Sequence, residues 1–139
     1  MAHLYYEFAG FPDTWATVDT RDTRNGFAHD AHVHGDVYGA HTSHYLNRTW
    51  ESWTGQSAIL AAIRDDVDDM RIDLLNSFKR ENGYKRMTPA RREAFDLFLT
   101  TDDGDVLEYR HALDLLDMVN NSTCEYAGRN GYIIRPRES

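Results

Sequence analysis

The chain has little of what secreted, zinc-binding and membrane proteins usually need. Cys124 is its single cysteine, so no internal disulfide can form, and structural zinc sites usually draw on several cysteines. No apolar run approaches the ~20 residues of a membrane span. The start MAHLYYEFAG has neither the basic segment nor the long apolar run of a signal peptide. We therefore expect a cytoplasmic protein in which Cys124 is a small buried or edge residue.

Basic residues are outnumbered by acidic ones. The sequence has 15 Lys and Arg against 23 Asp and Glu, a formal net charge of −8, which repels a phosphate backbone and argues against a broad nucleic-acid-binding surface. It contains no glycine-rich phosphate loop, nucleophile elbow or kinase motif. The stretch TTDDGDVLEYRH fails as a calcium loop, because aligning Gly104 with the turn glycine puts Leu99 and Arg110 at ligand positions. We expect no cofactor and no catalytic residue.

What the chain does have is enough apolar material for one core. At 139 residues, with 41% hydrophobic and 12% aromatic residues, it fits a single domain over residues 1–139. The aromatic run from His3 to Phe8 predicts a strand, and a looser alternation from His32 to Tyr38 predicts a second. Residues 13–30 are rich in turn formers and indicate a loop or irregular hairpin.

The middle of the chain predicts about three helices. Apolar residues recur three, four or seven apart along the first: Leu46, Trp50, Trp53, Leu60, Ile63, Val67, Met70, Leu74 and Phe78. Asn82-Gly83 would end it, Thr88-Pro89 would cap a second helix, and Asp105 with Glu108 would form the capping box of a third.

A hairpin at Asn130-Gly131 completes the chain. The fold class predicted is α+β, with a small antiparallel sheet from N- and C-terminal strands packed against about three helices. A mostly helical bundle stays open as the alternative.

Charge is sorted into blocks. Residues 79–92 hold six basic residues and one acidic, whereas residues 93–125 hold nine acidic residues and one arginine. The densest acidic stretch lies in the long helix: Asp65, Asp66, Asp68, Asp69 and Asp73. Its ordinary interpretation is the solvated face of an amphipathic helix. Aspartate is, however, a poorer helix former than glutamate, and clustered short carboxylates imitate a row of phosphates. These five residues are therefore our candidate partner-binding site, for a basic groove on a nuclease or other nucleic-acid-binding protein.

Six of the seven histidines precede residue 45. If His32, His34 and Asp36 share one strand face, they supply ligands for zinc or iron. A water bound to that metal would then be the nucleophile of a hydrolase. The run resembles the H-x-H-x-D start of the metallo-β-lactamase motif, but Val37 stands where that family has histidine, and the chain is too short for its fold. Without that family match, a metal-dependent hydrolase stays open as a second function.

The stretch YLNRTWESWTGQSAILAAI, residues 45–63, resembles segments of small proteins from phages and mobile elements. The resemblance implies an inhibitor of host defence of the anti-CRISPR or anti-restriction kind, acting by protein–protein contact in a bacterial host cell, and it assigns no functional residue. Trp50 and Trp53 are expected to be core anchors. A third hypothesis is a structural or regulatory homodimer, in which the basic segment of one copy meets the acidic helices of the other.

Overall fold

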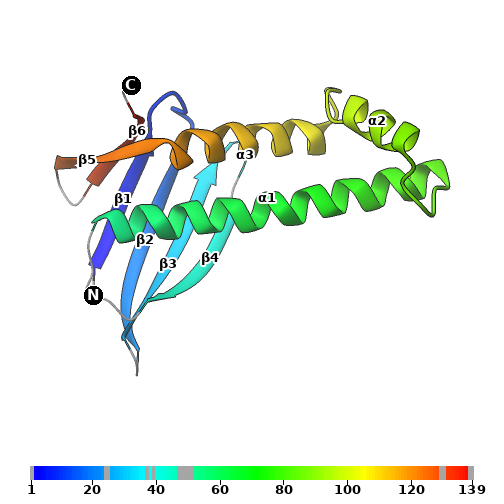
Figure 1. The fold of residues 1–139 in the computed structure, drawn as a ribbon. Helices are drawn as coiled ribbons and strands as arrows, with labels where there is room; N and C mark the ends of the chain where they lie inside the picture. The colour runs from blue at the N-terminus through cyan, green and yellow to red at the C-terminus, as the bar shows by residue number, and fades with distance from the viewer. Residues whose placement is uncertain are drawn as a thin grey trace.

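The computed structural model describes residues 2–23, 26–36, 38, 40–46, 52–128 and 131–137. Four strands come first, then three helices, then two more strands (Figure 1). The elements are β1 (Ala2–Phe8), β2 (Thr14–Thr23), β3 (Gly26–Gly35), β4 (Ala40–Leu46), α1 (Ser52–Asn82), α2 (Pro89–Phe98), α3 (Gly104–Asn120), β5 (Ser122–Gly128) and β6 (Gly131–Pro136).

The strands form one sheet in the order β4-β3-β2-β1-β6-β5. Neighbouring strands are antiparallel except β1 and β6, which run parallel, so the sheet is mixed rather than purely antiparallel. The α+β class is confirmed. Of the two alternatives predicted for residues 13–30, a loop or an irregular hairpin, the loop was wrong. β2 and the first half of β3 lie there and pair as antiparallel strands from Thr14↔Gly35 to Thr23↔Gly26.

Alternation along the strands assigns one sheet face to the core. In β1, Leu4, Tyr6 and Phe8 are buried, whereas Tyr5 and Glu7 between them are exposed. The buried faces of β2 and β3 carry small residues, and the pairs Ala16↔Val33 and Val18↔Ala31 lie opposite one another. Small residues at these positions leave room for helix α1 to approach the sheet.

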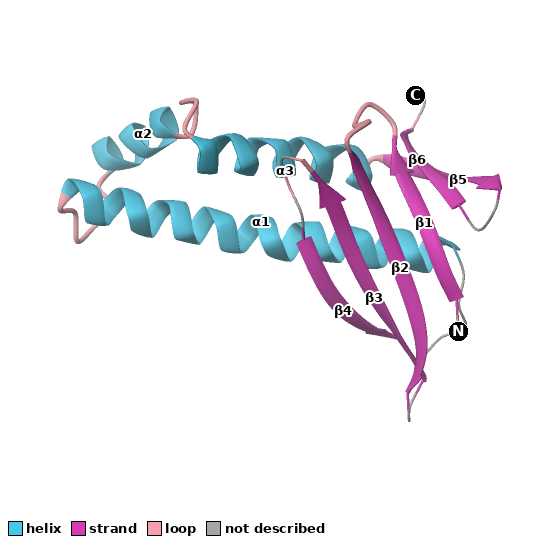
Figure 2. Cartoon of the chain, turned by 180° about the vertical axis from the view of Figure 1, so that it is seen from behind, coloured by secondary structure: helices cyan, strands magenta, loops and turns pink. Residues whose placement is uncertain are grey.

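The helices cover this buried face and leave the other face open (Figure 2). The first half of α1 crosses β2, β3 and β4, while the C-terminal end of α3 lies over β5 and β6. With 31 residues, α1 is about 46 Å long. Its second half therefore extends beyond the sheet beside α3, and α2 lies at the far end (Figure 1).

The predicted apolar stripe of α1 is confirmed where the structure describes it. Ile63, Val67, Leu74 and Phe78 are buried, together with Ile59. Leu46 was misplaced, because it is the last residue of β4. Trp50 lies outside the described residues, as does the side chain of Trp53. Among the described residues, no helix is long and apolar enough to cross a membrane.

The helix ends follow the sequence signals at two of three sites. Gly83, at φ 68°, ends α1, and the N–H groups of Gly83 and Tyr84 donate to the carbonyls of Arg80 and Lys79. Thr88 caps α2, with Pro89 at its first position. The capping box predicted at Asp105 is wrong, because α3 starts one residue earlier and the side chain of Asp103 accepts from the Asp105 N–H.

Candidate partner-binding surface on α1 and α3

The aspartates predicted as a binding site lie on the solvent side of α1. Asp65, Asp68, Asp69 and Asp73 are exposed, and their spacing of three and four residues places them on one helical face. We call these four the acidic face. Asp66 differs, because it is half-buried on the side of α1 that faces α3.

Nothing in the described part of the chain neutralises the acidic face by an ion pair. The salt bridges found there involve other carboxylates, such as Asp102 with Arg110 and Glu125 with Arg135. Arg71, within the same stretch of α1, donates instead to the hydroxyl of Tyr109 on α3 and lies over the ring of Phe95 on α2. The acidic face is therefore free to attract an external cation.

The charge density of the acidic face is close to that of one nucleic-acid strand. From Asp65 to Asp73 the axis of α1 rises about 12 Å, so the four carboxylates give about one charge per 3–4 Å. One strand of DNA carries about one charge per 3.4 Å. Like charges four residues apart also cost a helix about 0.2–0.5 kcal/mol per pair, as at Asp65 with Asp69 and Asp69 with Asp73. The sequence thus keeps a charge pattern that does not favour the helix itself.

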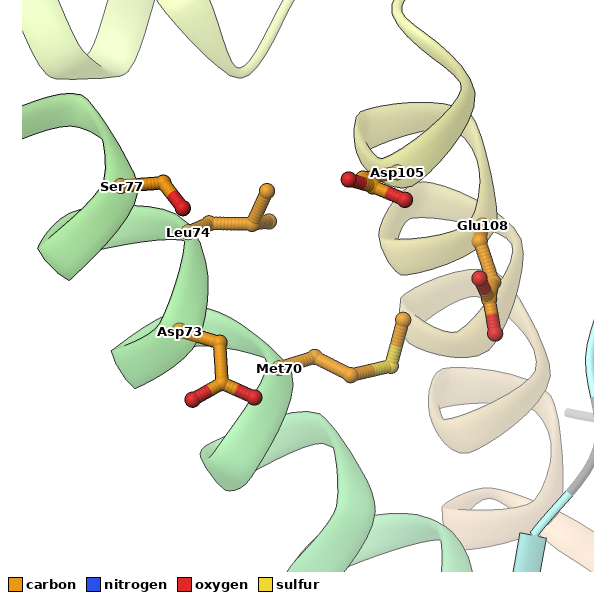
Figure 3. A pocket seen from close by; sticks show the side chains of 6 residues that line it. All are labelled: Met70, Asp73, Leu74, Ser77, Asp105 and Glu108. Atoms are coloured by element: carbon orange, nitrogen blue, oxygen red, sulfur yellow. The ribbon is translucent and has the colours of Figure 1, made fainter. Parts of the chain in front are cut away.

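A cavity of about 250 Å³ lies beside the acidic face, between α1 and α3 (Figure 3). We call it the acidic pocket, and its lining residues are Met70, Asp73, Leu74, Ser77, Asp105 and Glu108. Asp73 belongs to both the pocket and the acidic face. Asp66 lies one helical turn before Met70, on the sheet side of the pocket.

The carboxylates around this pocket act on one another. Partial burial raises the pKa of Glu108, and the neighbouring charges of Asp66 and Asp105 raise it further. Crowded carboxylates favour either a bound proton or a bound cation.

Tyr38, in the connection between β3 and β4, lies near two of these carboxylates, Asp66 and Glu108. It is 1% exposed. Its pKa is raised mainly by burial, next by a hydrogen bond with the Asp66 carboxylate, and then by the charges of Asp66 and Glu108, so the hydroxyl stays protonated.

Sequence reasoning missed Tyr38, Asp105 and Glu108 as members of one site. Asp105 and Glu108 were interpreted as a capping box, which the structure replaces with Asp103. Tyr38 was interpreted as the end of a strand, but β3 ends at Gly35. The packing of α1, α3 and the β3–β4 connection brings these groups near one another, and no local sequence pattern indicates those contacts.

The basic segment, residues 79–92, lies at the far end of the helices. Arg91 is over the ring of Tyr84, 4.2 Å from its centroid, and donates to the carbonyl of Arg86. No ion pair joins this fully described segment to the acidic helices within the chain. The basic residues of this segment therefore do not neutralise the acidic residues of the helices by ion pairs within one molecule.

His32 and His34 lie on the open face of the sheet, alternating along β3 with the buried Ala31 and Val33. The rings of His32 and His34 are stacked with centroids 5.8 Å apart, and Trp15 stacks on His34 at 5.4 Å. Asp36 follows the end of β3 and is exposed. In the part of the chain that the structure describes, no three His, Cys, Asp or Glu side chains are placed to hold a metal ion. The side chains of His41 and His44 lie outside it.

Cys124 is half-buried in β5, at the edge of the sheet. Burial and the neighbouring Glu125 raise the pKa of its thiol to about 11. Since the thiolate is the nucleophilic form, Cys124 is a poor nucleophile at neutral pH.

Comparison with protein-family models, with curated proteins and with solved structures finds no match to this chain. The function is therefore inferred from the surfaces described above.

Proposed function

We propose that this protein binds a basic nucleic-acid groove of another protein through the acidic face of α1 and blocks that groove. The observation that carries the proposal is the row of Asp65, Asp68, Asp69 and Asp73 on one exposed helical face, which no ion pair among the described residues neutralises. A partner that binds phosphates presents arginines and lysines, and these pair equally well with a row of carboxylates.

The partner we propose is a host-defence nuclease, such as a CRISPR effector, in the cytoplasm of a bacterial host. Its nucleic-acid channel is lined with positive charge, because the channel holds a phosphate backbone. The acidic face would occupy that channel by competition and without chemistry, as an anti-CRISPR-like inhibitor. The resemblance of residues 45–63 to phage and mobile-element proteins agrees with this class of partner.

The test is inhibition of target cleavage by purified CRISPR effectors. The variant carries Asp65→Lys, Asp68→Lys and Asp69→Lys. Its matched control carries Asp96→Lys, Asp114→Lys and Asp117→Lys, which make the same charge change at exposed positions on α2 and α3. We expect the first variant to lose inhibition and the control to keep most of it. Equal inhibition by wild type and the α1 variant would refute the proposal.

A further inference from the structure

A cavity of about 430 Å³ lies between α1 and α2, at the end of α1 that extends beyond the sheet (Figure 1). We call it the basic pocket, because two of its lining residues are arginines and one is an aspartate. The lining residues are Arg71, Leu75, Met87, Arg92, Phe95 and Asp96. A ligand that combines a phosphate with a flat apolar body matches this lining, because guanidinium groups bind phosphate and the other side chains offer apolar surface.

The basic segment adjoins this pocket and adds positive charge to it. Its one acidic residue is Glu81, and its six basic residues are Lys79, Arg80, Lys85, Arg86, Arg91 and Arg92. The structure describes every residue of the segment, and none of these cations forms an ion pair with another described residue. Such a cluster of cations attracts a ligand that carries several negative charges.

The acidic residues nearby do not cancel this attraction. Lys79 follows Asp73 by six residues, which is about 9 Å along the axis of α1. Exposed charges are largely screened beyond about 8 Å at physiological ionic strength. Even with Glu93 and Asp96 of α2 counted, residues 79–96 hold six basic residues and three acidic ones. An anionic ligand therefore meets positive charge at this end of the helices.

Two arginines at this end lie over aromatic rings. The guanidinium of Arg71 is 5.6 Å from the centroid of the Phe95 ring. That of Arg91 is 4.2 Å from the centroid of the Tyr84 ring. Unpaired bases stack on aromatic rings and on guanidinium planes, whereas a double helix keeps its bases stacked inside. Arg71 donates to the hydroxyl of Tyr109 through one of its five N–H groups, so it has further donors for a phosphate.

We infer that the basic pocket, together with the basic segment, binds the phosphate backbone of a single-stranded nucleic acid. Arg71 and Arg92 hold one phosphate, and the cations of the segment hold its neighbours. An acidic protein would supply the negative charge but not the flat faces of the bases. The inference goes beyond the proposed function, in which the acidic face meets the cations of a protein. It gives the helices a second binding site of opposite charge.

The experiment measures binding of the full chain to fluorescein-labelled oligo(dT) of about 12 nucleotides by fluorescence anisotropy. We expect saturable binding that weakens as salt rises, with a log–log slope of about −0.7 for each phosphate contacted. The same oligonucleotide paired with oligo(dA) should bind at least about tenfold more weakly. Absence of binding by the single strand, or equally tight binding of the duplex, would overturn the inference.

Variants connect the binding to the site. Arg92→Gln should weaken binding by about threefold, whereas Arg64→Gln should not, although it removes the same charge from an exposed position on α1. Lys85→Gln with Arg86→Gln changes only the connection between the two helices and should reduce the salt slope by about 1.4. If Arg92→Gln fails to fold, this double variant decides. A salt slope equal to that of wild type contradicts the inference.

Two other occupants of the basic segment are tested in the same assay. Displacement of oligo(dT) by poly-L-glutamate at equal charge concentration would overturn the inference in favour of an acidic protein. A dimer at low salt that oligo(dT) fails to dissociate would assign the segment to a second copy of the chain. No nuclease enters this experiment, and the acidic face lies outside the basic pocket. A failure here is therefore distinct from a failure of the proposed function.

Discussion

The guanidinium of Arg71 donates a hydrogen bond to the hydroxyl of Tyr109 over 3.3 Å and so joins α1 to α3. The same group lies 5.6 Å from the centroid of the Phe95 ring on α2. Arg71 is the one basic residue between Asp65 and Asp73. Its position ties the projecting helices together and keeps its charge on the α2 and α3 side of α1.

Replacing Arg71 by methionine should destabilise the protein. The change keeps a long apolar stem but removes one hydrogen bond and one cation–π contact, together worth about 1–2 kcal/mol. Urea denaturation measures the loss, with Arg64→Met as the control, because Arg64 belongs to the same helix and is exposed as Arg71 is, but the contacts with Tyr109 and Phe95 are made by Arg71. Equal stability of the two variants would show that Arg71 does not hold the helices together.

Neutralising the acidic face should stabilise the helix. Asp69→Asn removes like-charge pairs with Asp65 and Asp73, and we expect the free energy of unfolding to rise by about 0.2–0.5 kcal/mol per pair at low salt. The gain should shrink at high salt, because the pairs are exposed and screened. Chemical denaturation at two salt concentrations measures both effects.

The same substitution should weaken partner binding, so stability and binding move in opposite directions. Asp96→Asn is the control, since it removes one charge on α2 outside the acidic face. A variant at Asp69 that loses both stability and binding would mean that the carboxylate has a structural role.

The pKa of Glu108 predicts a pH dependence. Because its folded-state pKa is raised above the ordinary value of 4.5, the folded chain holds this proton more tightly than the unfolded chain. The contribution of Glu108 to stability is thus fully present below pH 4.5 and is lost as the pH rises through its folded-state pKa. Glu108→Gln should therefore be more stable than wild type at pH 7, by about 0.2–0.5 kcal/mol for its pair with Asp105, and not below pH 4.5. Thermal unfolding of both proteins from pH 4 to pH 8 checks this, and a difference that is constant with pH would contradict it.

Two glycines at helix ends should respond in opposite directions to alanine. Gly83 has φ 68°, so Gly83→Ala should cost about 1–2 kcal/mol. Gly104 starts α3, and an added Cβ there would meet no atom within 4 Å, so Gly104→Ala should stabilise by about 0.4–1 kcal/mol. Calorimetry of both variants tests the pair, and a loss of stability at Gly104 would contradict the assigned start of α3.

The fold class could be predicted because its signals are local. Apolar residues at helical spacing defined α1, and the Asn82-Gly83 and Thr88-Pro89 signals located the turn between α1 and α2. The number of strands could not be predicted in the same way. Residues 13–30 have turn-forming composition, yet Ala16 and Val18 pair with Val33 and Ala31 and gain their stability from α1 packing above them.

The candidate site likewise has one part that local sequence signals predict and one part that they do not. The acidic face could be predicted, since residues three and four apart share a face of any helix. The acidic pocket could not, because Asp73 of α1 and Glu108 of α3 line one cavity only through the packing of the two helices. Likewise, the strand pattern placed His32 and His34 on one face, but it did not show that their rings stack with Trp15.

The central claim, that the acidic face imitates a phosphate backbone, is tested most directly by the salt dependence of affinity for an inhibited nuclease. The dissociation constant is measured from 50 to 300 mM salt, as an order-of-magnitude range in which screening changes strongly. We predict a steep, linear rise of log Kd with log salt, and a flatter line with at least about tenfold weaker binding at low salt for Asp65→Asn with Asp68→Asn and Asp69→Asn. A dissociation constant that does not change with salt, or a variant whose dissociation constant equals that of wild type at every salt concentration, would contradict the account.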